Sequence, residues 1–296
     1  MKGAAIGLLL VVPMWLCSAC QIPPETTGIY TGPTATLDEV IARVNANNSA
    51  IPTLWARQNF EGTIVDDKHD SHEISADGVI LYRAPHELLI TAHNEFGSVF
   101  EIGVTAEVYW LKVVPSLDTL WWGKMANVGK PTTVNIPLRP DLILDVLAVN
   151  EIDPNLLNEP HAVMRFNNEA DMYMVDTIVR AADRLLVQKE VWYDRQTLEP
   201  RKVLLYDAKG RVVLRANLSD FQAVASGGDS GGAGDTGGAA PYIAGTYKLF
   251  FPDTGSKMTF TLSQAALSKN GIPHAGSIHL PDLGNPGVGH VVQVDQ

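Results

Sequence analysis

From Phe60 onward, apolar residues recur at every second position, and this period restricts the chain to a fold made mainly of β-strands. Residues 101–110 show it best, because apolar side chains at the even-numbered positions alternate with more polar neighbours. Similar runs lie near 60–65, 79–83, 87–92, 172–180, 185–193, 201–207, 211–219, 246–251 and 258–262. Turn-forming residues at Asp77-Gly78, Phe96-Gly97 and Asp207–Gly210 separate neighbouring runs. The pattern predicts one mainly antiparallel β domain with few helices, in the α+β class.

Two helices are expected beside these strands. Thr36 and Glu39 form the pattern of a capping box, in which each side chain accepts a hydrogen bond from the other residue's backbone N–H. The apolar residues at helical spacing are Leu37, Val40, Ile41, Val44, Ile51 and Leu54. We therefore expect a helix that runs to about Asn47 and resumes after it. Pro140-Asp141 predicts the start of a second helix, because both residues suit a first turn.

Both cysteines of the chain, Cys17 and Cys20, lie in the N-terminal stretch LCSAC. Lys2 and an apolar run too short to span a membrane precede them, as in a secretory signal peptide. The stretch resembles the lipobox of bacterial lipoproteins, with Cys20 as the acylated residue. An ordinary cleaved signal is the alternative. We expect a signal peptide over 1–19 and, from its Pro, Thr and Gly content, a flexible tether over 20–35.

The net charge of the full chain is −11. Removal of the signal peptide, whose only charged side chain is Lys2, makes it −12. No cluster of Lys or Arg is found in the sequence. Nucleic acid is therefore not an expected partner, and attraction to anionic lipid head groups is not favoured.

Residues 225–241 have a low-complexity Gly, Ser and Asp composition, which predicts a disordered insertion within the β domain. Strand-like runs resume after it. The domain is therefore expected to extend from 36 to 296.

Motifs of catalysis or metal binding are weak. The stretch DDKHDSHE contains His69 and His72 among carboxylates, but we interpret it as a solvated hairpin tip rather than a metal site. Ser230 lies in a Gly-Asp-Ser-Gly-Gly match to a protease motif, yet low-complexity sequence surrounds it. No nucleophile elbow, phosphate loop or dinucleotide fingerprint is present. We expect no enzymatic activity, no metal and no cofactor.

Adjacent bulky residues mark several strands. A sheet covered on one side would leave one member of each pair in water. Either both faces are covered, or one face lines an apolar cavity. The pairs are Tyr109 and Trp110, Trp121 and Trp122, and Trp192 and Tyr193.

The run from Gly78 to Gly123 resembles the bacterial lipoprotein-carrier superfamily (LolA/LolB-like). It contains a strand that ends in Arg83-Ala84-Pro85, a second strand over Leu88–Ala92, and a strand with an aromatic pair before Pro115. The similarity extends over roughly 36–296, apart from the Gly-rich insertion. It is a pattern of strands rather than a single invariant motif.

The resemblance implies a single curved antiparallel half-barrel sheet with helices over its concave face. It also implies an apolar cavity that takes acyl chains or other lipids. Tyr109, Trp110, Trp121, Trp122, Trp192 and Tyr193 are then candidate cavity residues. In soluble carriers the residue before the proline is an Arg that helps to close a helical lid. Here Ala84 stands there, so Arg83 is the lid-related candidate, on the opposite face of its strand.

Together these features predict a lipid-anchored envelope lipoprotein that binds lipid or the acyl chains of lipoproteins for transport or sorting. Its membrane contact would be the Cys20 anchor, and Gln21 after it favours the outer membrane, facing the periplasm. The alternative is a tethered protein-interaction or envelope-sensor module. Its half-barrel would be filled by its own side chains, and it would bind an envelope protein partner.

Overall fold

The computed structural model describes residues 30–295, apart from 96, 129–135, 182 and 227–239. The helices are α1 (Leu37–Asn48), the 3-10 turn η1 (Met125–Asn127) and α2 (Pro140–Val146). The strands of the N-terminal half are β1 (Thr53–Val65), β2 (Ser71–Arg83), β3 (Glu87–Asn94), β4 (Gly97–Val104), β5 (Val108–Val113) and β6 (Thr119–Lys124). Those of the middle are β7 (His161–Asn167), β8 (Met172–Ala181), β9 (Arg184–Asp194), β10 (Pro200–Tyr206) and β11 (Val212–Ser219). The last are β12 (Gln222–Ala223), β13 (Tyr242–Ile243), β14 (Thr246–Phe250), β15 (Lys257–Ala266) and β16 (His290–Gln293).

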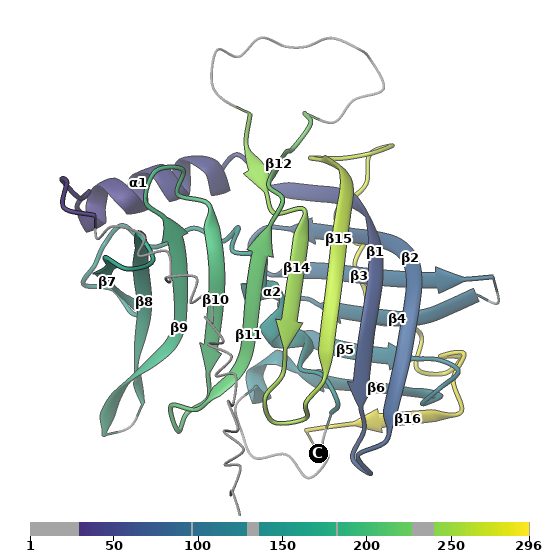
Figure 1. Ribbon diagram of the computed structural model, residues 1–296. Helices are drawn as coiled ribbons and strands as arrows, with labels where there is room; N and C mark the ends of the chain where they lie inside the picture. Colours follow the sequence, from purple (N-terminus) through teal and green to yellow (C-terminus); the bar gives the residue numbers. More distant parts are fainter. Residues whose placement is uncertain (1–29, 96, 129–135, 182, 227–239, 296) are drawn as a thin grey trace, which may run out of the picture.

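Fourteen of these strands form one sheet in the order β16-β6-β5-β4-β3-β2-β1-β15-β14-β11-β10-β9-β8-β7. Adjacent strands of this sheet pair antiparallel, except that β16 runs parallel to β6. The sheet is open, with β16 and β7 at its edges, and it bends so that β3–β6 pass crosswise behind β11, β14 and β15 (Figure 1). The predicted curved half-barrel is confirmed, and the sheet is mixed rather than wholly antiparallel. Within the described residues, no helix has the length and apolarity to span a membrane.

The capping box at the start of α1 is confirmed. Thr36 accepts a hydrogen bond from the Glu39 backbone N–H at 3.3 Å, and Glu39 accepts one from the Thr36 backbone N–H at 2.8 Å. The helix ends at Asn48 and does not resume. Leu54 instead belongs to β1, opposite Tyr82 of β2. The prediction of a resumed helix was wrong. The position of Leu54 fits the spacing of a helix face only by chance.

β2 is one continuous strand through Asp77-Gly78, so the turn expected there is absent. Gly78 has a different role. The buried side chain of Gln58 crosses this position and donates to the Thr91 carbonyl at 2.8 Å. A Cβ at Gly78 would lie 2.9 Å from the Gln58 amide nitrogen and 1.7 Å from the Thr91 oxygen. The glycine therefore permits close approach of a neighbouring strand rather than a reversal of the chain.

α2 lies inside the curve of the sheet (Figure 1). As predicted, Pro140 stands in its first turn. We call residues 136–153, which contain α2 and its flanks, the plug segment. Its buried apolar side chains face the concave side of the sheet and are Leu138, Ile143, Leu144, Val146, Leu147 and Val149. The main core therefore lies between the concave face, α1 and the plug segment.

A second, smaller core lies on the convex face. Leu81, Trp110 and Leu120 pack there with Ile278 and other residues of the segment that leads to β16. The Trp110 ring covers Gly103, where a Cβ would come within 1.9 Å of the ring. Lys112 donates to the Pro286 carbonyl at 2.7 Å and helps to hold this segment on the sheet. Part of the sheet is thus covered on both faces.

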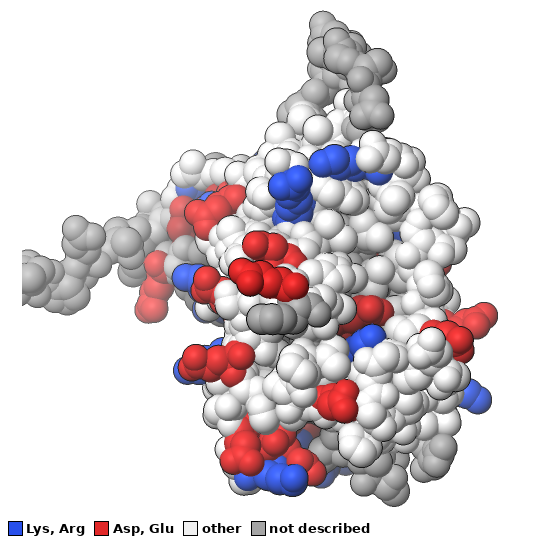
Figure 2. Space-filling view, turned by 90° about the vertical axis from the view of Figure 1, so that its right-hand side faces the viewer, with Lys and Arg blue, Asp and Glu red and all other residues white. Residues whose placement is uncertain are grey.

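The predicted signal peptide, most of the tether and most of the insertion lie outside the described residues. Tyr30, at the described end of the tether, packs under the Arg195 guanidinium. The central carbon of this group lies 3.6 Å from the centre of the Tyr30 ring. The Ala35 N–H donates to the Tyr173 hydroxyl at 2.7 Å. This end of the tether therefore lies against β8. On the face that Figure 2 shows, acidic and basic side chains are scattered and form no continuous basic patch.

Candidate functional site

A partly enclosed space on the concave side lies where the plug segment meets β7, β8 and β9. We call it the rim cavity, and its volume is about 90 Å³. Its walls are apolar where Ala162, Val175 and Val191 point inward from these strands. Such a space holds several waters, since one water needs roughly 10–15 Å³ on this measure. It can therefore admit the end of a hydrocarbon chain.

The mouth of the rim cavity is charged. Asp145, Glu151 and Asp153 of the plug segment and Lys189 of β9 stand around it. Lys189 donates to Asp145 at 2.8 Å, so one positive and one negative charge are matched. An apolar interior below a polar mouth is the arrangement that suits an amphiphile.

The space beneath α2 is almost filled. About 10 Å³ remains there, which is room for about one water. Its walls are wholly apolar and consist of Ile80, Ile90, Ile143, Val146, Leu147, Tyr247, Leu249, Phe260 and Leu262. α2 therefore occupies the position that a ligand would need in the centre of the half-barrel.

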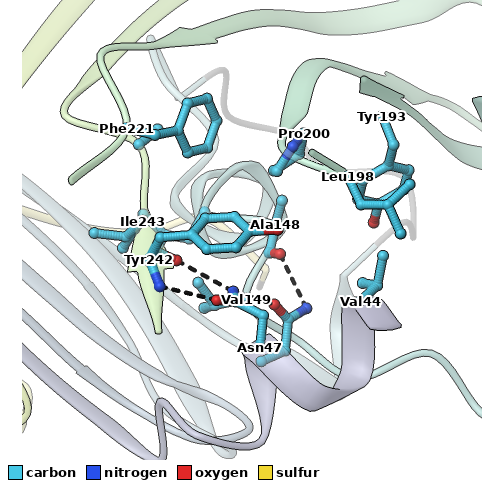
Figure 3. A pocket seen from close by; sticks show the side chains of 13 residues that line it. Val44, Asn47, Ala148, Val149, Tyr193, Leu198, Pro200, Phe221, Tyr242 and Ile243 are labelled. Carbon is cyan, nitrogen blue, oxygen red and sulfur yellow. Dashed lines mark hydrogen bonds between the residues drawn. The ribbon is translucent and has the colours of Figure 1, made fainter. Parts of the chain in front are cut away.

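A third small space, also of about 10 Å³, lies between α1, the end of the plug segment and β13 (Figure 3). Asn47 of α1 exchanges two hydrogen bonds with the backbone of Tyr242 beside it, at 2.8 and 3.1 Å. Leu147 lines both this space and the one beneath α2, and Ala148 lines both this space and the rim cavity. Leu147 and Ala148, the two residues after α2, thus separate all three spaces.

Polar contacts fasten the end of the plug segment. Asn45 of α1 accepts from the Ile152 N–H at 2.8 Å and donates to the Ile152 carbonyl at 2.7 Å. Asn48 donates to the carbonyls of Ala148 and Asn150, at 3.2 and 2.9 Å. These hydrogen bonds join the end of the plug segment to α1.

The sequence candidates divide between the two faces. Tyr109, Trp121 and Tyr193 lie on the side of the main core, and Tyr193 lines the rim cavity. Trp110 and Trp122 belong to the convex core. Trp192 stands on the convex side, where its indole N–H donates to Glu190 and Lys202 lies 4.2 Å from its ring centre. One member of each pair thus faces the concave side, as the alternation requires.

The lid-related candidate Arg83 forms a bidentate ion pair with Glu87, with both distances 2.6 Å. This pair bridges the turn between β2 and β3 and does not reach the plug segment. The lipidation candidate Cys20 lies outside the described residues. So does Ser230 of the protease-like motif.

The hairpin tip DDKHDSHE connects β1 to β2, and His72 lies 3.1 Å from Asp66 within it. In the part of the chain that the structure describes, no group of three or more His, Cys, Asp or Glu is arranged to hold a metal ion.

Two buried polar atoms of the described chain have no hydrogen-bond partner of normal geometry, the Gln58 Oε1 and the Tyr247 hydroxyl. Burial raises the pKa of Tyr247 far above its ordinary value and outweighs the nearby Ala244 backbone, which acts to lower it. Burial also raises the pKa of Tyr82 to about 12, with a smaller contribution from the charge of Glu151. Tyr82 is hydrogen bonded, because its hydroxyl donates to Asn150 at 3.0 Å.

The sequence did not indicate Ala162, Val175 or Val191 as cavity residues. Val175 and Val191 lie in runs that were expected to form strands, whereas no strand was expected at Ala162. A small space beside the plug segment depends on how that segment packs against the sheet. Of the plug segment, the sequence predicted only the helix that starts at Pro140-Asp141.

An open, curved sheet with helices on its concave side is the LolA/LolB-like architecture that the sequence resemblance implies. No family model matches the sequence, and no curated protein does.

Solved structures give matches of fold. A LolA superfamily protein from Nitrosomonas europaea is similar at 10% identity with a TM-score of 0.44, covering 79% of this chain and 93% of that one. A DUF1329 family protein from Desulfovibrio piger has 10% identity and a TM-score of 0.49, covering 77% and 90%. A domain described as an outer membrane lipoprotein-sorting protein, from Vibrio parahaemolyticus, has 14% identity and a TM-score of 0.42, also covering 77% and 90%. The similarity concerns the fold alone.

Proposed function

We propose that this chain is a lipid-anchored protein of the bacterial envelope that binds the apolar chain of a lipid or lipoprotein on the concave side of its sheet. The observation that supports the proposal is the rim cavity, with apolar walls below a charged mouth beside a plug segment held by polar contacts. The anchor at Cys20 and the location facing the periplasm are parts of the proposal that come from the N-terminal sequence.

Binding by such a site requires no catalytic residue. Each methylene buried from water contributes roughly 0.8 kcal/mol, so a long chain is held by apolar contact alone. A transfer protein of this kind works by relative affinity, because the chain passes to whichever partner binds it more tightly.

Deep binding requires the plug segment to move. The space beneath α2 is too small for a chain, so Ile143, Val146 and Leu147 must leave the concave face as the ligand enters. The ligand then replaces apolar contacts that the plug gives up. The hydrogen bonds of Asn45 and Asn48 are exchanged for bonds to water at a small net cost.

A second candidate function has its own support. The near-complete filling beneath α2 is also what a protein-interaction or sensor module would show, with its half-barrel permanently packed. Such a module would bind an envelope protein through loops or through the open edge of β7.

The test uses residues 21–296, which contain every helix and strand of the structure. This chain is expressed with a cleaved signal peptide in a bacterial periplasm, and native mass spectrometry with lipid extraction identifies what co-purifies. We expect an acyl lipid. Ala162→Phe should abolish co-purification, because its ring would fill the rim cavity.

The matched control is Val163→Phe, the next residue of β7, which is 42% exposed and faces away from the cavity. It should retain the lipid. A lipid-free mass for the unchanged chain, with no uptake of added lipid, would favour the packed module over lipid binding.

A further inference from the structure

The mouth of the rim cavity carries negative charge that no basic side chain matches. Lys189 is already paired with Asp145, 2.8 Å away. Glu151 and Asp153 form no salt bridge with any Lys, Arg or His of the described residues. Hydrogen bonds from the Asn158 amide and the Asn155 backbone N–H lower the pKa of Asp153, so it is ionised at neutral pH.

These charges lie directly above apolar walls. A ligand whose chain enters between Ala162, Val175 and Val191 would leave its head group among Asp145, Glu151 and Asp153. An anionic head group would find no free cation there, because Lys189 is occupied.

We propose that the rim cavity is specific for amphiphiles with a cationic head group, in particular a primary ammonium. This inference rests on the proposed function, since it assigns the ligand class of the same site. Glu151 and Asp153 are its specificity-determining residues. They would act by charge attraction to the head group, while the walls hold the chain.

The experiment compares three ligands with the same dodecyl chain: dodecylamine, dodecanoate and dodecanol. Their binding to residues 21–296 is measured at neutral pH and low salt, below the concentrations at which they form micelles. We expect dodecylamine to bind about tenfold more tightly than dodecanoate, with dodecanol between them, since the exposed charges of Glu151 and Asp153 each contribute modestly. Added salt should reduce the difference.

The variant Glu151→Gln/Asp153→Asn should bind all three ligands with similar affinity. Its control is Glu61→Gln/Glu73→Gln, which removes the same charge from two exposed acids on the convex face of β1 and β2. This control should keep the preference for the amine. Circular dichroism and binding of the uncharged dodecanol show that the variants are folded.

Two biological sources of the head group are compared in the same way. Lysophosphatidylethanolamine carries the ammonium beside a phosphate, and a lauroylated lysine amide carries it alone. Charge-dependent binding of either, lost in the Glu151 and Asp153 variant, supports the proposal and names the source.

The outcomes separate the two claims. Equal binding of dodecylamine and dodecanoate, or tighter binding of dodecanoate, would overturn the cationic specificity and leave lipid binding intact. Failure of all three dodecyl ligands to bind would overturn both the specificity and the proposed function.

Discussion

Ala148, immediately after α2, has a φ of +54°, a left-handed conformation that favours glycine. For a residue with a side chain, this conformation is roughly 1–2 kcal/mol less favourable than the right-handed one. Ala148→Gly should therefore raise the free energy of unfolding by about 1 kcal/mol, measured by chemical denaturation. Ala223→Gly in the exposed part of β12 is the control and should lower it by roughly 0.5–1 kcal/mol. A loss of stability in Ala148→Gly would mean that the methyl group contributes more than the strain costs.

Two buried tyrosines, Tyr82 and Tyr247, differ in the environment of their hydroxyl groups. The Tyr82 hydroxyl donates to Asn150, whereas that of Tyr247 has no hydrogen bond of normal geometry. We expect Tyr82→Phe to lower the free energy of unfolding by about 0.5–1.5 kcal/mol and to leave the Asn150 oxygen without this donor. Tyr247→Phe should be neutral or stabilising. If thermal or chemical denaturation shows that both substitutions lower the stability equally, the Tyr247 hydroxyl has a hydrogen-bond partner.

The same tyrosines predict the response to alkaline pH. An unfolded tyrosine ionises near pH 10, whereas burial raises the pKa of folded Tyr82 to about 12. Between these values the unfolded chain has lost a proton that the folded chain keeps, so stability falls as pH rises. Burial shifts Tyr193 and Tyr247 in the same direction. Denaturation midpoints measured across this range should fall less steeply in Tyr82→Phe, and an unchanged slope would refute the assignment.

At the scale of elements, α1 holds the plug segment through side chains rather than through apolar packing alone. Asn45 accepts a hydrogen bond from the Ile152 N–H. Asn45→Ala should therefore increase hydrogen exchange at the Ile152 amide by at least about tenfold, while exchange in the strands stays unchanged. Asn59→Ala on the convex face of β1 is the control. Unchanged exchange at Ile152 would show that the plug segment opens independently of α1.

The elements that were predictable are those with local signals. The capping box at Thr36 and Glu39 fixed the start of α1, and Pro140 fixed the start of α2. The failures came from patterns that have two meanings. Leu54 fits a helical stripe but lies in β1, and Asp77-Gly78 fits a turn but lies within β2, where tertiary contacts decide.

At the scale of the whole molecule, the candidate site was only half predictable. Alternation placed one member of each aromatic pair on the concave face. It could not show that Trp110 and Trp122 would be covered on the other face by the segment around Ile278, because a segment rich in Gly and Pro has no period. The plug segment likewise fills the half-barrel through contacts between residues distant in sequence.

The central claim is that an apolar chain binds on the concave side, between the plug segment and β7–β9. Photocrosslinking with a fatty acyl chain that carries a diazirine near its end tests this directly, with mass spectrometry to locate the adducts. We predict adducts at the walls of the rim cavity, including Ala162, Val175 and Val191, and their loss in Ala162→Phe. Adducts confined to exposed apolar residues such as Leu157 and Leu185, or unchanged by that substitution, would contradict the account.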